Sequence, residues 1–165
     1  MPTMTKSRLA DVKLDIAKDD REALVELLNQ QLADTADLQS QLKQAHWNVR
    51  GLGFQQVHLL FDDQAELFEE YVDMLAERVA LLGGVAQGTV RSAARASRLE
   101  EFPAGWVKVE AAVTAVRDRV AAYAAGNRRA LAAANELGEP TTEDLLTEIS
   151  RGVDKQLYFL ESHLH

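Results

Sequence analysis

Residues 54–82, FQQVHLLFDDQAELFEEYVDMLAERVALL, decide the fold of this chain. Apolar residues recur along this stretch at alternating steps of three and four, and the recurrence is sustained over four repeats. That spacing is typical of one buried face of a long helix. The positions on this face are Phe54, Val57, Phe61, Ala65, Phe68, Val72, Leu75, Val79 and Leu82. We therefore expect a helix that packs against other helices along its whole length.

The sequence on either side of this stretch predicts three more long helices. Their expected ranges are 19–49 for the first, 103–135 for the third and 141–164 for the fourth. Asp19 or Asp20 can cap the first helix, and Thr141 or Thr142 can cap the last. Glycine pairs at 51–53 and 83–84 are expected to end the first and second helices.

A long connection separates the second and third predicted helices. It covers residues 85–102, and VRSAARASRLE (90–100) is expected to form a short helix within it. Four helices with one long crossover in the middle match the ferritin-like arrangement of an all-α four-helix bundle. No strand pattern or internal repeat competes with this fold. We assign residues 1–18 to a flexible polar tail and residues 19–165 to the bundle domain.

Composition narrows the class of protein further. The chain has 165 residues, no cysteine and a formal net charge of −8, from 26 acidic and 18 basic residues. Disulfides and thiolate metal sites are therefore excluded, and a uniform nucleic-acid-binding surface would repel phosphate. The start of the chain has no apolar core of signal-peptide length. We expect a cytoplasmic protein, with association with the nucleoid left open.

Two pairs of possible metal ligands lie on the second helix, each pair four residues apart. They are His58 with Asp62, and Asp73 with Glu77. On an ideal helix all four fall within about 100° of each other, beside the apolar face. Isolated acids at such positions are usually solvated, and a lone histidine is more often an interface residue, so the spacing alone leaves both interpretations open.

The rise of the helix separates the two pairs. Asp62 and Asp73 are about 16 Å apart along the axis, so one ion cannot be shared between the pairs within one straight helix. Either there are two half-sites, or a second copy of the helix runs antiparallel and brings the pairs together at a two-fold axis. His46 is close enough in sequence to join the His58 end. Imidazoles and carboxylates together suit Fe(II), Mn(II) or Zn(II).

Sequence spacing also argues against a site within one bundle. Di-iron centres inside ferritin-like bundles usually use Glu-x-x-His pairs. None of the four histidines has a glutamate three residues before it. The geometry between two copies is therefore favoured.

These residues carry a family resemblance. The pattern LKQAHWNVRG, F, VH, FD, D, AER and LGG, with EPTTEDLLTEISRGVDKQLYFLESHL near the end, resembles the Dps proteins, which are mini-ferritins. The resemblance covers nearly the whole chain. It implies a ferroxidase centre, with His46, His58 and Asp62 from one subunit and Asp73 and Glu77 from its mate. It also implies that iron is oxidised by hydrogen peroxide or dioxygen, and that ferric mineral is stored in a homo-dodecameric shell built from two-fold dimers.

The resemblance suggests further roles outside the centre. Trp47 stands where the family has an aromatic beside the site; it is either a large packing residue or a radical quencher. Glu139, Asp144 and Glu148 fall in the region that lines an acidic pore in the family; the alternative is a capping turn with solvated acids.

DNA binding is the second class of function that the sequence allows. In the family it often uses a lysine-rich N-terminal tail, but here residues 1–15 contain only Lys6, Arg8 and Lys13 as basic residues and Asp11 and Asp15 as acidic ones, a net side-chain charge of +1. Compaction of DNA as the main role is therefore the alternative to iron oxidation. The terminal His163 and His165 are two residues apart and do not share a helix face. A surface metal contact, a frayed helix end and the absence of any role are the alternatives, and the last is favoured.

Overall fold

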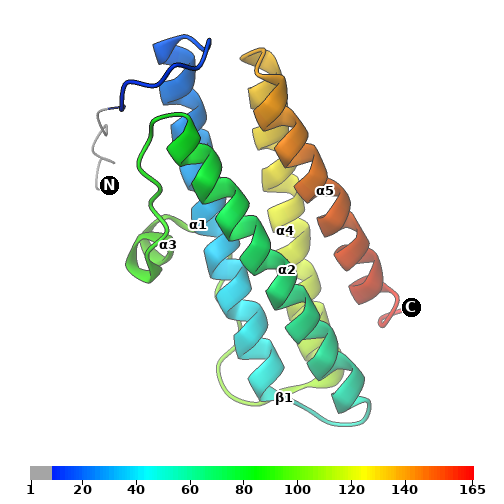
Figure 1. The fold of residues 1–165 in the computed structure, drawn as a ribbon. Helices are drawn as coiled ribbons and strands as arrows, with labels where there is room; N and C mark the ends of the chain where they lie inside the picture. Colours follow the sequence, from blue (N-terminus) through cyan, green and yellow to red (C-terminus); the bar gives the residue numbers. More distant parts are fainter. Residues whose placement is uncertain (1–8) are drawn as a thin grey trace.

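A computed structural model describes residues 9–165, and the statements below concern these residues. Four long helices form the molecule (Figure 1). They are α1 (Lys18–Asn48), α2 (Phe54–Leu81), α4 (Val109–Glu136) and α5 (Pro140–Glu161). The short helix α3 (Val90–Ala96) lies in the crossover between α2 and α4, beside α1 (Figure 1). The predicted all-α, ferritin-like bundle with a short helix in its long crossover is confirmed.

The crossover sets the direction of the helices. α1 and α2 are antiparallel neighbours joined by a short turn, and so are α4 and α5 (Figure 1). The crossover returns along the bundle, so that α2 and α4 run in the same direction (Figure 1). Within residues 9–165, no helix is long and apolar enough to cross a membrane.

The core is built from the faces that the apolar spacing predicts. Leu24, Leu28, Leu32 and Leu42 of α1 are fully buried. On α2 the buried positions include Phe61, Phe68, Leu75 and Val79, and on α5 they include Leu146, Ile149 and Val153. Since all four long helices contribute to one continuous apolar cluster, the bundle forms a rigid support for side chains on its outer faces.

Two short strands were not expected. β1 (Val49–Arg50) and β2 (Val107–Lys108) pair in parallel, with Val49 opposite Val107 and Arg50 opposite Lys108. They leave the predicted all-α fold unchanged, because the pair contains only two residues from each segment. Both valines are buried, so the strand pair closes one end of the bundle. There the residues after α1 pair with the last residues of the crossover, directly before α4.

Three predicted helix starts need correction. The third long helix begins at Val109, because Gly105 takes a positive φ of 86° and the next residues are extended in β2. Ala17 precedes α1 without a side-chain cap, and Asp19 and Asp20 lie within its first turn. α5 is capped by Glu139, ahead of the threonines that the sequence suggested.

An ion pair between the half-exposed Arg98 and the buried Asp34 fixes the crossover on α1. The Arg98 guanidinium donates to the Asp34 carboxylate at 2.6 and 2.9 Å, and the Arg98 backbone N–H donates to its other oxygen at 2.8 Å. Asp34 is only 3 % exposed, and a buried carboxylate needs such partners. Arg119 of α4 then donates to the carbonyl oxygens of Glu100 and Glu101, which holds the next part of the crossover.

The segment before α1 lies against the end of α2. The Ala10 N–H donates to the Gly83 carbonyl at 2.8 Å, and Leu9 and Ile16 pack partly against the core. Residues 1–8 of the predicted tail, with Lys6 and Arg8, lie outside the described residues.

Candidate metal centre

His46 and His58 face each other where α1 ends and α2 begins. Their rings are stacked, with centroids 3.7 Å apart and planes 16° apart. The turn between the helices brings them together although they are twelve residues apart in the chain. Phe54, one turn before His58 on α2, stacks on the His58 ring at 4.9 Å.

Reciprocal hydrogen bonds fix both rings. His46 Nδ1 is 2.7 Å from the His58 carbonyl oxygen, and His58 Nδ1 is 2.8 Å from the His46 carbonyl oxygen. A carbonyl only accepts, so each Nδ1 carries the hydrogen. In the neutral rings both Nε2 atoms therefore have a free lone pair, which is the form that binds a metal.

Asp62 completes this cluster, one turn further along α2. Its Oδ1 is 3.9 Å from His46 Nε2 and 2.5 Å from Lys43 Nζ. The hydrogen bond from Lys43 holds the pKa of Asp62 below its ordinary value, and the neighbouring histidines act in the same direction. Asp62 is thus ionised at neutral pH, as a ligand must be.

Lys43 is the residue of this cluster that sequence reasoning missed. It lies one turn before His46 on α1, and its side chain and that of Asp62 are each 32 % exposed. Its spacing from His46 puts both on one face of α1, and this was the available signal. A cation that binds here has to share Asp62 with an ammonium group or displace it.

Asp73 and Glu77 do not join this cluster within one chain. Both are exposed on α2, and the helical rise puts Asp73 about 16 Å from Asp62. Among residues 9–165 of a single copy, no group of three or more His, Asp or Glu side chains is arranged to hold one ion. One copy places Asp62 close to the stacked His46 and His58 without a complete ligand set, and leaves Asp73 and Glu77 apart from them.

Trp47 lies beside the cluster on the solvent side. Its side chain is 60 % exposed, and Lys43 Nζ lies 6.0 Å from the ring centroid. It does not pack into the core of its own chain. An exposed tryptophan next to polar ligands is suited to contact with another molecule.

Glu139 has a structural position in the turn between α4 and α5. Its carboxylate accepts hydrogen bonds from the backbone N–H groups of Thr141 and Thr142. It also accepts one from the Arg78 guanidinium, at 2.8 Å. Burial raises the pKa of Glu139, but the hydrogen bonds from Thr142 and Arg78 outweigh it and lower the pKa to about 2. The side chain is 9 % exposed, so its oxygens are engaged within the chain.

Two other acids of the predicted pore remain available. Asp144 and Glu148 are exposed on the second and third turns of α5, one helical turn apart. They are neighbours on one face of this helix. Any pore role of this region therefore rests on these two side chains.

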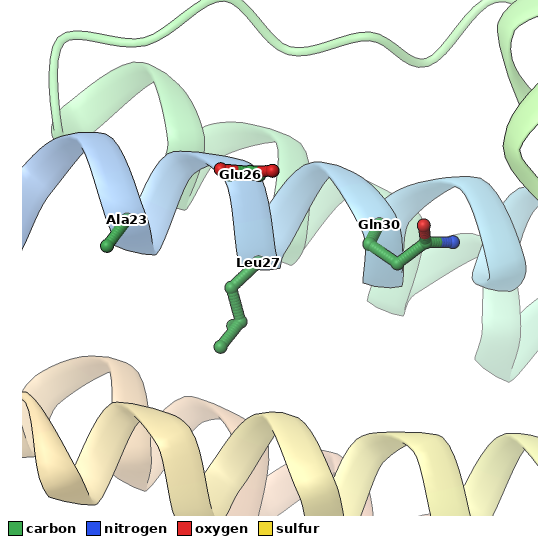
Figure 2. Close-up of a pocket in the computed structure, with 4 residues that line it drawn as sticks. All are labelled: Ala23, Glu26, Leu27 and Gln30. Atoms are coloured by element: carbon green, nitrogen blue, oxygen red, sulfur yellow. The ribbon is translucent and has the colours of Figure 1, made fainter. Parts of the chain in front are cut away.

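Two further places in the molecule offer no ligand set. His163 is exposed, and its Nδ1 lies 2.7 Å from the Phe159 carbonyl. A shallow hollow of about 350 Å³ along α1 is lined by Ala23, Glu26, Leu27 and Gln30, with Leu27 directed toward α4 (Figure 2). Glu26 is its only carboxylate, and no histidine lines it.

Comparison with known proteins identifies the family. The family model of the ferritin-like domain matches residues 25–165. A DNA protection during starvation protein of Agrobacterium fabrum is 36 % identical over 152 residues, which are 92 % of this chain and 94 % of the relative.

Solved structures agree with this match. DpsC from Streptomyces coelicolor superposes with a TM-score of 0.92 at 31 % identity, over 100 % of this chain and 96 % of that one. Dps of Mycobacterium smegmatis gives 0.89 at 28 % identity, over 98 % and 95 %. Fold, sequence and family model therefore agree that the chain belongs to the Dps family of ferritin-like proteins.

Proposed function

We propose that this protein oxidises and stores iron, and thereby protects DNA. Two copies form each ferroxidase centre: one supplies His46, His58 and Asp62, and the other supplies Asp73 and Glu77. The observation that carries the proposal is the fixed pair of imidazoles, whose Nε2 atoms are free beside an ionised carboxylate. The relatives named for DNA protection during starvation support the physiological role.

One two-fold register completes the centre. If two α2 helices are antiparallel and residue i faces residue 135 − i, then His58 faces Glu77 and Asp62 faces Asp73 of the second copy. Both pairs meet in the same register because each pair of residue numbers adds to 135. A two-fold axis repeats the arrangement, so one dimer has two equivalent centres.

Iron is the substrate, and the imidazoles and carboxylates of the chain have different roles toward it. Neutral imidazoles bind Fe(II), and the three carboxylates stabilise the higher charge of Fe(III). The oxidant that we propose is hydrogen peroxide, with dioxygen as the slower alternative. Two Fe(II) ions give one electron each to one peroxide molecule, which yields two hydroxide ions and avoids release of a hydroxyl radical.

Storage requires an enclosed space and an entry route. We propose a dodecameric shell built from these dimers, with Asp144 and Glu148 lining an acidic entry pore. Exposed carboxylates attract Fe(II) by simple charge. Because removal of iron and peroxide protects only DNA in the same compartment, the proposed location is the cytoplasm.

The test separates the two halves of the centre. Asp73→Asn and Glu77→Gln are each expected to slow initial peroxide-dependent Fe(II) oxidation at least tenfold, measured by stopped-flow absorbance. Glu70→Gln, an exposed acid on the same helix outside the predicted set, is the matched control and should keep the normal rate.

A mixing experiment tests that the centre is shared. Asp62→Asn alone and Asp73→Asn alone should both be slow, but hetero-dimers of the two variants retain one intact centre. Unfolding and refolding the variants together should therefore restore about a quarter of the wild-type rate, because half of the dimers are mixed and each has one of two centres. If the mixture showed no recovery of the oxidation rate, the intersubunit assignment would be wrong.

DNA binding is a separate question with its own measurement. Lys13 is exposed, and Lys6 and Arg8 lie outside the described residues. If DNA compaction were the main role, a gel shift with duplex DNA should persist at moderate salt. A purely electrostatic tail contact loses affinity steeply as salt rises.

A further inference from the structure

Two arginine side chains lie together over Gly126, where α4 meets α1 and the crossover. A Cβ atom at Gly126 would lie 3.2 Å from Arg98 Nη2 and 3.7 Å from Arg129 Nη2. The two nitrogens are therefore no further apart than these two distances together. Gln31 Oε1 of α1 lies at the same point, 3.7 Å from that Cβ position. We name Arg98 and Arg129 the arginine pair.

Arg98 is the fixed member of the arginine pair. Its Nε and Nη2 donate to the Asp34 carboxylate, and Nη2 also donates to Gln31 Oε1 at 2.9 Å. Among residues 9–165, no hydrogen bond uses Arg98 Nη1, and the side chain is 45 % exposed. The protein therefore holds one edge of this guanidinium and leaves two N–H donors available.

Arg129 has all of its donors available in the described part of the chain. The residue is exposed, and within residues 9–165 its guanidinium makes neither a hydrogen bond nor an ion pair. Its neighbour Arg128, by contrast, donates to both oxygens of Asp154 at 2.7 and 2.8 Å. The positions one helical turn away from Arg129 on α4 are glycine or alanine, so none of them supplies an acid.

The placement of Arg129 beside Arg98 costs electrostatic energy unless an anion joins them. Two guanidinium groups at this separation repel each other, and Asp34 neutralises only one of them. Arg95, three residues before Arg98, is exposed too and adds a further positive charge. The chain as a whole has a net charge of −8, so this concentration of arginine is a local feature.

The donors of the arginine pair fit a tetrahedral oxyanion. Arginine binds phosphate through N–H donors at about 2.7–2.9 Å, so one phosphate can bridge two guanidinium nitrogens up to about 8 Å apart. Gly126 keeps the space between the two groups open, because it has no side chain there. We propose that the arginine pair binds a phosphate dianion, either inorganic phosphate or the terminal phosphate of a small organic molecule.

The phosphates of duplex DNA fit this place less well. A protein that binds a duplex neutralises several phosphates in succession. Here the crossover continues from Arg98 to Glu100 and Glu101, which are both exposed and repel a neighbouring phosphate. A single small anion between Arg98 and Arg129 needs no further contact.

The experiment measures binding of inorganic phosphate to the full-length, iron-free protein by titration calorimetry at low ionic strength. Arg129→Gln should weaken phosphate binding roughly fivefold or more, because charged hydrogen bonds are lost. Arg128→Gln is the matched control: it removes the same charge one residue away, from a side chain already paired with Asp154, and should keep the wild-type affinity. Arg98 stays unchanged in both variants, since it also anchors the crossover. Circular dichroism checks that both variants are folded.

The outcomes separate the sources of the phosphate. Tighter binding of ribose 5-phosphate than of inorganic phosphate would support an organic ligand, and equal or weaker binding would support inorganic phosphate. Absence of phosphate binding by the wild type, or an equal loss in Arg129→Gln and Arg128→Gln, would overturn the proposal. If Arg129→Gln instead weakened only the binding of a short DNA duplex, the arginine pair would be a DNA contact and the proposal would be wrong.

Discussion

At the residue scale, metal binding at the candidate centre depends on whether Lys43 or a metal ion is bound to Asp62. In one copy this carboxylate is held by Lys43, and among residues 9–165 no three His, Asp or Glu side chains are arranged to hold one ion. The histidines are held by backbone carbonyls and need no partner from outside. The imidazoles are therefore ready to bind an ion, whereas the carboxylate must exchange one cation for another.

Replacing Lys43 tests this exchange. Lys43→Gln should increase the affinity for Co(II), a divalent probe, by roughly two- to fivefold, because an ammonium that competes for Asp62 and repels the ion is removed. Titration calorimetry near neutral pH measures the change. Lys18→Gln, which removes a surface lysine paired with Glu22, is the control. Weaker Co(II) binding in Lys43→Gln would show that the lysine supports the site.

The interactions of Glu139 are expected to make the stability of the folded chain depend on pH in the acid range. Its pKa is lowered to about 2 in the folded chain, so the unfolded chain binds this proton more readily. The contribution to stability is therefore present above the unfolded pKa of about 4.5 and is lost as the pH falls from about 5 to 2. Glu139→Gln should remove about 1–3 kcal/mol at neutral pH and less in acid, measured by urea unfolding at several pH values.

Glu143→Gln is the control for this effect. Glu143 also lies in the first turn of α5, but its carboxylate meets only the exposed Asn135 side chain. An equal loss of stability in the two variants, at all pH values, would contradict the assigned role of the Glu139 cap.

At the element scale, α2 and α5 approach closely at one point. The Tyr71 hydroxyl of α2 reaches Gly152 of α5, and a Cβ there would overlap the hydroxyl oxygen. Burial raises the pKa of Tyr71, and its ring packs edge-on against Phe68. Glycine costs helix stability in an isolated helix, so its presence here reflects the space that Tyr71 needs.

Gly152→Ala should destabilise the bundle by about 1–3 kcal/mol, because α5 has to move away from Tyr71. Gly126→Ala on α4 is the matched change, since its Cβ would lie 3.2 Å from Arg98 Nη2, a contact that a shift of a few tenths of an ångström relieves. That variant should change the free energy of unfolding by less than about 1 kcal/mol, because the better helix propensity of alanine offsets the small shift of the Arg98 guanidinium on Asp34. Thermal unfolding measures both. Addition of Tyr71→Phe should reduce the cost of Gly152→Ala, and no reduction would contradict this explanation.

The elements also show how far sequence reasoning extends. The helices followed from apolar spacing, because burial of one face determines a long helix. The β1–β2 pair was missed, since two-residue strands have no periodicity and Val107 lies far from Val49 in the chain. In the site, the chain turn brought His46 near His58 as expected, but Lys43 bonding to Asp62 depends on how two helices pack, which spacing along one helix does not give.

At the scale of the whole molecule, the proposed ferroxidase centre needs a second copy of the chain. Asp73 and Glu77 are exposed on α2, away from His46 and His58 of the same chain, so the proposal assigns them to the centre of a partner copy.

A cross-link tests the register of the two-fold contact. Glu69 lies close to the proposed axis and within about 20° of His58 around α2, so two copies of residue 69 should come near each other. The chain has no cysteine, so Glu69→Cys supplies the only thiol. Mild oxidation should convert most of it to a disulfide-linked dimer on a non-reducing gel. Asp154→Cys, on the outer face of α5, should remain monomeric on that gel.

The reciprocal bonds of His46 and His58 have a consequence for mutagenesis. Each imidazole is hydrogen-bonded to the main chain of the other helix, so the pair also stabilises the turn between α1 and α2. A histidine variant would therefore lose activity for two reasons at once, the missing ligand and a less stable turn. Asparagine, whose amide can still donate to the opposite carbonyl, is the substitution that keeps this hydrogen bond while it weakens the binding of iron.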